Sequence, residues 1–288
     1  MKEKTEPLIV HVHIPKCAGT TFRREIVPHW LNRNQYRLFD RVHIEKGDQR
    51  RKELKDQTKR ESLRLISGHD VYGIADDFGR DVETMTFLRD PFERQISLWS
   101  HHKHRSSGIL PEWQYIFSRF ENCSAFVAGS DVMYEFWHSF LTGEEQDNLL
   151  ITAREGLSAR RISMPDSFGL REIGYLYLRD ELPELYERVS DLAKSRLNSS
   201  LCLLASHFDE SLVLLNAIYG APLIKYKKQR IGRNTDLDYQ NAKVNLAALR
   251  TQQPLATQIY NSWVSTFFDL CNKTEKFSLS LQKLARAQ

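Results

Sequence analysis

The chain has 288 residues, of which 41% are hydrophobic, and this is long enough for one large α/β domain or two small ones. Its formal net charge is only +4, so the composition does not indicate nucleic-acid binding, which usually goes with a much larger basic excess. The four cysteines lie far apart without a Cys-x-x-Cys pair, so neither a zinc site nor a disulfide framework is predicted.

The first predicted elements are a buried strand at 8–14, a tight loop at 15–19 and a helix at about 20–32, which begin with the stretch LIVHVHIPKCAGTTF. This order is typical of an anion site, because the first N–H groups of a helix have no partner within the helix and the helix dipole adds positive charge there. Small loop residues let a phosphate approach the backbone, and Lys16 with the two following threonines adds a charge and hydroxyl donors. The loop is not a Walker A motif, because its lysine precedes the glycine.

A dense run of charge at 45–61 follows a short predicted strand at 36–40. We interpret this run as a solvated helix or loop. The alternative is a basic lip over an anionic ligand, such as a sulfated or uronic-acid sugar, formed by Arg50, Arg51 and Lys52.

A third buried strand is predicted at 63–67, and Gly68-His69 follows it directly. In open α/β sheets, ligands bind outside the carboxyl ends of the strands. Because Lys16 and Arg89 also follow predicted strands, we expect three polar side chains at three strand ends to converge on one site.

The next strand, at 84–88, is predicted to lead into a helix with a strong start signal. Asp90 suits the N-cap, Pro91 the first helical position and Glu93 the third position of a capping box. Ser97 then lies about two turns along the helix from the end of the strand.

Apolar residues recur at three- and four-residue spacing from 111 to about 193, so a helical insertion is predicted at about 105–195. We interpret its aromatic residues mainly as core residues. Trp99, Trp113 and Trp137 are also candidates for stacking on a saccharide.

The C-terminal part begins with a predicted strand at 200–205 and a helix at 206–220. Ser206 and Asp209 suit a capping box at the start of this helix, and Gly220 suits its end. Two further helices are predicted at about 239–250 and 254–271. Because the chain has no internal repeat or low-complexity linker, we expect it to form one domain, 1–288.

Two stretches, PKCAGTTF and LRDPFERQISL, resemble the phosphosulfate-binding signatures of the sulfotransferases. They are most similar to the carbohydrate branch (heparan and chondroitin type, sulfotransferase family 2), whose patterns run like HIPKTGGTTF and LRDPxERxxS. The segment SGHDVYG resembles the Gly-His motif of that family. The resemblance implies an α/β, P-loop-like three-layer fold with a central, mainly parallel sheet flanked by helices.

The resemblance also implies a donor, 3′-phosphoadenosine-5′-phosphosulfate (PAPS), and a product, adenosine 3′,5′-bisphosphate (PAP), with no metal required. His69 would be the catalytic base, with an unperturbed pKa of about 6.5, and Lys16 would stabilise the leaving group. The residues implied to bind the donor are Lys16, Cys17, Ala18, Gly19, Thr20, Thr21, Arg89, Ser97, Arg230, Arg233 and Thr235. The implied acceptor is a carbohydrate or another hydroxyl-bearing molecule, and the sequence does not identify it.

Two other classes of function remain as alternatives. A P-loop kinase or NTPase lacks support, because Gly-Lys-Ser/Thr is absent and no clear metal-binding carboxylate follows a strand. A non-catalytic nucleotide- or glycan-binding protein would be expected to lose Lys16 or His69, and both are present.

The location of the protein is predicted from what the sequence lacks. No apolar run approaches the roughly 20 residues needed to span a bilayer, and the N-terminus does not read as a signal peptide. We therefore expect a cytoplasmic, prokaryotic enzyme, with the catalytic domain of a Golgi-luminal enzyme as the alternative. The sequence does not indicate an oligomeric state.

Overall fold

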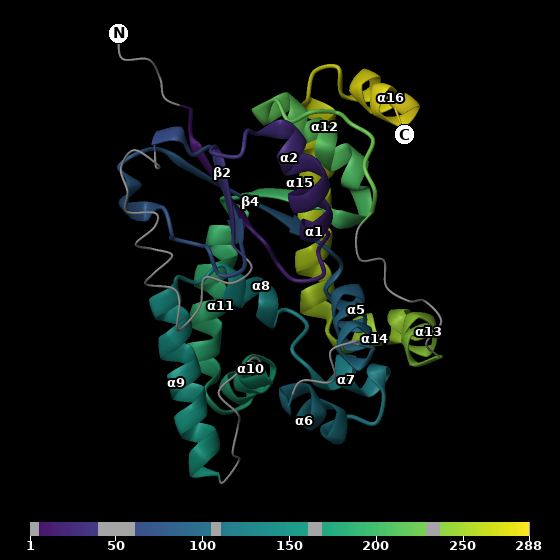
Figure 1. Ribbon diagram of the computed structural model, residues 1–288. Helices are drawn as coiled ribbons and strands as arrows, with labels where there is room; N and C mark the ends of the chain where they lie inside the picture. Colours follow the sequence, from purple (N-terminus) through teal and green to yellow (C-terminus); the bar gives the residue numbers. More distant parts are fainter. Residues whose placement is uncertain (1–5, 40–60, 105–110, 161–168, 229–236, 288) are drawn as a thin grey trace.

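The computed structural model describes residues 6–39, 61–104, 111–160, 169–228 and 237–287 (Figure 1). Within these residues lies a five-stranded sheet in the order β2-β3-β1-β4-β5, in which every pair is parallel. The strands are β1 (Leu8–Val12), β2 (Tyr36–Phe39), β3 (Leu65–Gly68), β4 (Val82–Leu88) and β5 (Leu201–Leu204). The predicted α/β fold, a parallel sheet between layers of helices, is confirmed.

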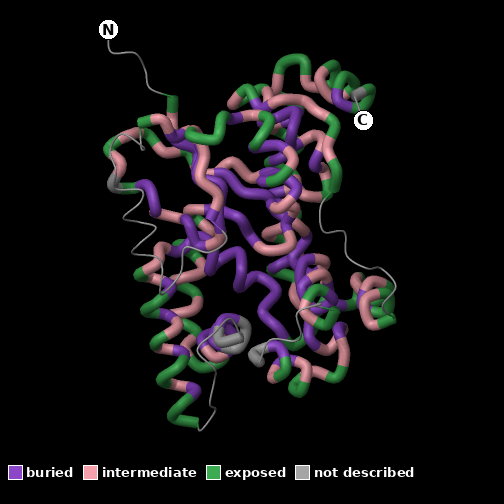
Figure 2. The backbone as a smooth tube through the Cα atoms, viewed as in Figure 1, coloured by how far each residue is buried: buried purple, intermediate pink, exposed green. Residues whose placement is uncertain are grey.

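The central strand β1 is buried along its whole length, and so is its neighbour β3 (Figure 2). A strand that is covered on both faces needs apolar residues at nearly every position, and LIVHV and LISG largely meet this requirement. The two polar side chains in these strands contact each other, because His11 Nδ1 lies 2.7 Å from the hydroxyl of Ser67. The sheet therefore forms the centre of the hydrophobic core.

The strand register brings the carboxyl ends of three strands to the same edge of the sheet. Val12 pairs with Gly68 of β3 and with Thr86 of β4, and Leu88 pairs with Leu204 of β5. The residues that follow β1, β3 and β4 therefore leave the sheet side by side, as the sequence predicts.

The helix predicted after β1 is present, but it contains a widened turn. It consists of α1 (Gly19–Thr21), a π-helical turn η1 (Phe22–Ile26) and α2 (Val27–Trp30). The widened turn ends two residues before Pro28. This proline has no N–H, and its ring would clash with a carbonyl of the preceding turn in a regular α-helix.

Seven helices lie between β4 and β5 in the described part of the chain, where the sequence predicts a helical insertion. They are α5 (Pro91–Lys103), α6 (Pro111–Arg119), α7 (Cys123–Gly129), α8 (Tyr134–Ser139), α9 (Gly143–Ala159), α10 (Gly169–Glu181) and α11 (Pro183–Asn198). Trp99, Trp113 and Trp137 are all buried, so these three side chains are core residues and not exposed stacking platforms.

The chain after β5 is helical. Its helices are α12 (Phe208–Tyr219), α13 (Leu237–Val244), α14 (Leu246–Gln252), α15 (Pro254–Lys273) and α16 (Phe277–Ala287). The end of α12 at Gly220 is as predicted, with φ at 71°. The capping box is wrong: a 3₁₀ turn, η3 (Ala205–His207), precedes the helix, and Asp209 accepts a hydrogen bond from the Tyr226 hydroxyl at 2.7 Å.

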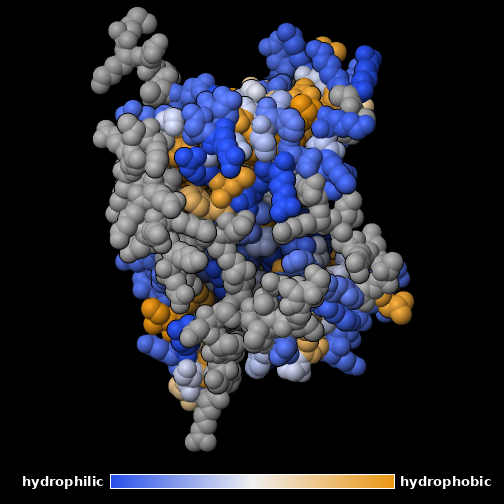
Figure 3. Space-filling view, in the orientation of Figure 1, coloured by the Kyte–Doolittle hydropathy of each residue, from blue (hydrophilic) through white to orange (hydrophobic). Residues whose placement is uncertain are grey.

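The described surface in Figure 3 is mainly hydrophilic, with apolar residues in small separate groups. Such scattered apolar residues are normal for a surface in contact with water. In the described ranges, no helix combines the length and the apolar character that crossing a membrane requires.

Candidate active site

The loop between β1 and α1 has an unusual backbone. Lys16 and Ala18 both have positive φ, 68° and 63°, although neither is glycine. The left-handed conformation costs roughly 1–2 kcal/mol for such a residue, and strain of this kind persists mainly at functional sites. Successive backbone N–H groups in alternating conformations form a concave anion-binding surface, and this loop leads directly into a helix N-terminus.

Gly19 begins α1, and its lack of a side chain is required by a neighbouring ring. A Cβ atom at this position would lie 2.1 Å from Cδ2 of His13, which is far inside van der Waals contact. The ring of His13 stacks in turn on His69, with 4.2 Å between centroids and 20° between planes. His13 therefore joins the loop after β1 to the Gly-His motif after β3.

The sequence prediction missed His13. Its backbone N–H donates to the Gly68 carbonyl at 2.8 Å, so it leaves the sheet beside His69. The guanidinium of Arg23, on the first helix, lies 3.3 Å from Nδ1 of His13. The signal that could have found His13 is its position: like His69, it directly follows a strand.

His69 is mostly enclosed, and its Nδ1 is buried without a hydrogen-bond partner among the described residues. Burial lowers the pKa of His69 to about 4, and the Asp70 carboxylate opposes this shift. The unperturbed pKa expected from the sequence is therefore wrong for the ligand-free protein. The imidazole is neutral at physiological pH and able to accept a proton, but it is a weaker base than an exposed histidine.

The loop and the β4–α5 junction lie against each other. Burial raises the pKa of the Cys17 thiol to about 12, while the positive charges of Arg94 and Arg89 oppose the shift. Cys17 is therefore an uncharged thiol in the site. Two basic side chains close enough to act on it show that the strand exits of β1 and β4 are brought together.

Arg94 is a second residue that the sequence prediction missed. It is fully buried, although its guanidinium is charged. It donates to the side-chain oxygen of Gln95 at 2.7 Å and lies over the ring of Tyr134, 5.3 Å from its centroid. Because Arg94 lies near Cys17, a buried positive charge stands behind the loop that follows β1.

The helix after β4 starts as predicted, and Asp90 accepts a hydrogen bond from the Glu93 backbone N–H at 2.9 Å. The Glu93 side chain instead meets Arg89 at 3.3 Å and Lys243 at 2.7 Å. Asp90 also pairs with Arg250 at 2.7 Å. Helices α13 and α14 therefore bring two more basic residues to the start of α5, and no motif in the sequence pointed to them.

The remaining predicted donor-binding residues fall into two groups. Thr20, Thr21 and Ser97 are described, and Thr21 is buried while the other two are partly exposed. Ser97 lies on α5, eight residues after Arg89, which stands between the end of β4 and the N-cap of this helix. Outside the described residues lie Arg230, Arg233 and Thr235, as well as the basic run Arg50, Arg51 and Lys52.

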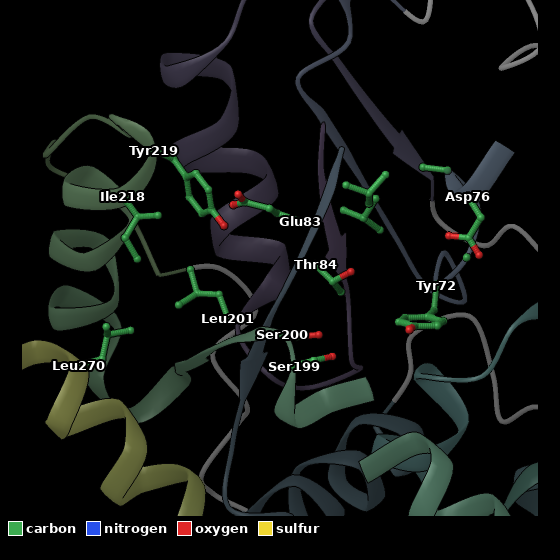
Figure 4. Close-up of a pocket in the computed structure, with 14 residues that line it drawn as sticks. Tyr72, Asp76, Glu83, Thr84, Ser199, Ser200, Leu201, Ile218, Tyr219 and Leu270 are labelled. Carbon is green, nitrogen blue, oxygen red and sulfur yellow. The ribbon is translucent and has the colours of Figure 1, made fainter. Parts of the chain in front are cut away.

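A separate cavity of about 580 Å³ lies away from these residues (Figure 4). Glu83 and Thr84 near the start of β4 line it, with Leu201 at the start of β5. The cavity is therefore close to the amino ends of these strands, whereas the site described above is at the carboxyl ends. None of the predicted donor-binding residues lines it.

The profile of the sulfotransferase family matches residues 3–162, a range that contains the loop after β1, His69, Arg89 and Ser97. A search of curated protein sequences gave no match.

Proposed function

The chain belongs to the sulfotransferase family, and from this premise we propose that it transfers the sulfuryl group of PAPS to an acceptor hydroxyl, on a carbohydrate. The observation that carries the proposal is the meeting of two anion-binding features at one sheet edge. One is the left-handed loop after β1, and the other is Arg89 at the end of β4. PAPS offers a matching pair of groups, a 5′-phosphosulfate and a separate 3′-phosphate.

In this proposal the loop after β1 binds the 5′-phosphosulfate through backbone N–H groups, with Lys16 adding a full charge. Arg89 and Ser97 bind the 3′-phosphate. The planar guanidinium of Arg89 can make paired, charge-assisted bonds to phosphate oxygens. Its present partner, Glu93, keeps a second cation in Lys243, so Glu93 retains a partner when Arg89 turns to a phosphate.

The chemical step is a displacement at sulfur. The acceptor oxygen forms the new bond to sulfur, the bond from sulfur to the 5′-phosphate oxygen breaks, and that oxygen keeps the electron pair. His69 takes the acceptor proton, a contribution typically worth about 10²–10⁴-fold in rate. Lys16 stabilises the charge that develops on the departing oxygen. The negative charge of a bound donor raises the pKa of a nearby imidazole, which makes His69 a better base than in the free protein.

We also propose that the chain works as one sulfotransferase domain. The family match ends at residue 162, yet β5 lies beyond it and pairs with β4 from Met85 to Leu88. The sheet that carries the site is therefore completed by residues outside the matched range.

The kinase alternative finds no support in the site. The carboxylate of Asp90, which follows β4, caps α5 and pairs with Arg250, so its oxygens are occupied by contacts within the protein. A magnesium-dependent transfer needs a carboxylate that is available to the metal.

The first test is calorimetric titration of the whole chain with PAP, and with ATP plus magnesium for comparison. We expect micromolar or tighter binding of PAP and little binding of ATP. Binding of ATP with magnesium alone would contradict the two-phosphate assignment. Transfer of radiolabelled sulfuryl groups from PAPS to desulfated heparin then tests the acceptor class. A protein that binds PAP but transfers nothing to any polysaccharide would contradict the carbohydrate acceptor.

A second test addresses Arg89 directly. Arg89→Ala is expected to weaken PAP binding much more than 5′-AMP binding, because only PAP carries a 3′-phosphate. A matched control is Arg24→Ala, an exposed arginine on η1, which should leave both affinities unchanged. Equal losses for PAP and 5′-AMP in Arg89→Ala would contradict the placement of the 3′-phosphate.

A further inference from the structure

A buried ion pair lies directly beside His69. Asp70 follows it in the chain with φ at 57°, a left-handed conformation. Arg171 of α10 donates to both carboxylate oxygens of Asp70, at 2.9 Å and 3.5 Å. The two side chains are almost completely buried, with 1% and 5% of their surface exposed. The paired geometry and the exclusion of water make this a strong, directional contact.

Helix α8 completes the surroundings of this pair. Glu135 lies 3.9 Å from the Arg171 guanidinium, and His138 lies 3.7 Å from the Asp70 carboxylate. The hydroxyl of Tyr175, also on α10, is 3.4 Å from the other ring nitrogen of His138. The cluster thus ties the exit of β3 to two helices of the region between β4 and β5.

The backbone around His69 is fixed on both sides. On one side Gly68 belongs to β3, where a Cβ atom would lie 2.8 Å from the Phe39 carbonyl oxygen, so the strand allows no side chain there. On the other side Asp70 is held by Arg171. The His69 ring itself packs on His13. The imidazole therefore has little freedom as long as the ion pair is intact.

We propose that Arg171 is a positioning residue for the sulfuryl-transfer step, acting through Asp70 to fix the backbone that aims His69 at the acceptor hydroxyl. This inference rests on the proposed function. A base must lie within hydrogen-bond reach of the proton it takes, and displacements near 1 Å can cost about 10²-fold in rate. Arg171 lies beyond residue 162, where the family match ends, so the match itself does not point to it.

The test uses substitutions that remove the pair while sparing the backbone. Asp70→Asn removes the charge, and asparagine tolerates the left-handed conformation that position 70 requires. Arg171→Met removes the cation, and Arg171→Lys keeps the charge without the paired geometry. The double variant Asp70→Asn/Arg171→Met removes both charges of the pair, and Glu135 keeps the charge of Arg94 nearby, so this variant is expected to fold if Arg171→Met does not. Arg196→Met is the control, because it breaks another arginine–carboxylate pair, with Glu145, in the same helical region, where the pair is more exposed than Arg171 and Asp70.

With desulfated heparin as acceptor, we expect kcat to fall about 10- to 100-fold in Asp70→Asn, Arg171→Met and the double variant. Arg171→Lys should recover part of the loss, and Arg196→Met should keep the wild-type kcat. PAP affinity should stay within about twofold of wild type in every variant, because the substituted residues are not among those proposed to bind the donor. Unchanged kcat in folded variants would overturn the positioning role, and so would a loss of PAP affinity as large as the loss of kcat.

A titration of His69 by NMR provides a readout that needs no activity. The positive charge of Arg171 lowers the pKa of His69 and the Asp70 carboxylate raises it. Arg171→Met should therefore raise this pKa and Asp70→Asn should lower it, although both reduce kcat. If kcat followed the pKa, rising in one variant and falling in the other, the pair would tune basicity and the positioning role would be wrong. Absence of transfer by the wild-type chain would contradict the proposed function instead.

Discussion

At the scale of single residues, the site depends on two histidines that share one stack. His69 was predicted from its motif, whereas His13 emerges only when the neighbouring strands are placed in register. The stack explains why position 19 is glycine, and why the His69 ring is enclosed enough for its pKa to shift. The packing of His13 against His69 therefore also affects the pKa of His69.

The low pKa of His69 predicts an unusual pH profile. A base must be unprotonated, so activity is lost as the pH falls through its pKa, which is about 4 in the free protein. The kcat/KM for the donor reports ionisations of the free enzyme. From pH 7.5 to 5.5 this quantity should change little, whereas a histidine with the ordinary pKa of about 6.5 would reduce it about tenfold. A tenfold fall would show that His69 is not buried as described, or is not the base.

The contact between Gly19 and His13 gives a second prediction. Gly19→Ala places a methyl carbon 2.1 Å from Cδ2 of His13, so the ring or the loop must move. We expect a loss of about 1–3 kcal/mol in the free energy of unfolding, measured with urea. In a His13→Ala background the same substitution should cost much less, because its obstacle has been removed. An equal cost in both backgrounds would mean that the methyl group collides with something else.

At the scale of elements, the start of α5 combines a cap with ion pairs from the C-terminal helices. Asp90 caps the helix and pairs with Arg250, while Glu93 pairs with Lys243. The cap was predictable, because it depends on residues three positions apart. The ion pairs were not, since their partners are separated by more than a hundred residues in the sequence.

Two substitutions of Asp90 separate these contributions. Asp90→Asn keeps an N-cap acceptor but loses the charge, and Arg250 is partly exposed, so the loss in unfolding free energy should be below about 1 kcal/mol. Asp90→Ala also removes the cap and should cost about 1 kcal/mol more. Urea denaturation of both variants tests this order, and equal costs would mean that the cap contributes nothing.

Features that depend on residues close in the sequence were predictable, and features that depend on distant residues were not. Strands β1, β3 and β4 were predicted because each is a short apolar run next to a local turn or cap signal, and the site residues at their ends followed from strand order. Arg171 was not, because its partner Asp70 is 101 residues away and nothing local marks a buried arginine. Contacts between distant segments carry no periodic signal in one sequence.

At the scale of the whole molecule, two buried histidines make stability depend on pH. Burial lowers the pKa of His11 well below 6.5 and that of His69 to about 4. Between these values and 6.5 the unfolded chain binds more protons than the folded chain, so stability falls as the pH falls. Each histidine adds a slope of up to about 1.4 kcal/mol per pH unit.

This slope can be measured by urea denaturation between pH 5 and 7.5, above the range in which most carboxylates titrate. The free energy of unfolding should be nearly constant above pH 7 and decline below 6.5. His69→Gln should reduce the slope, since it removes one of the two groups. A slope that is unchanged in this variant would contradict the burial of His69.

The pairing of β5 with β4 also bears on the order in which the chain folds. The two strands are separated by the whole helical region, so β4 becomes a central strand only after residues 201–204 have been made and have docked. Until then its hydrogen-bonding edge is open to other chains, and open strand edges are templates for aggregation. During synthesis, β1, β3 and β4 therefore leave the ribosome well before β5, which covers the open edge of β4. The chain is most prone to aggregation in this interval.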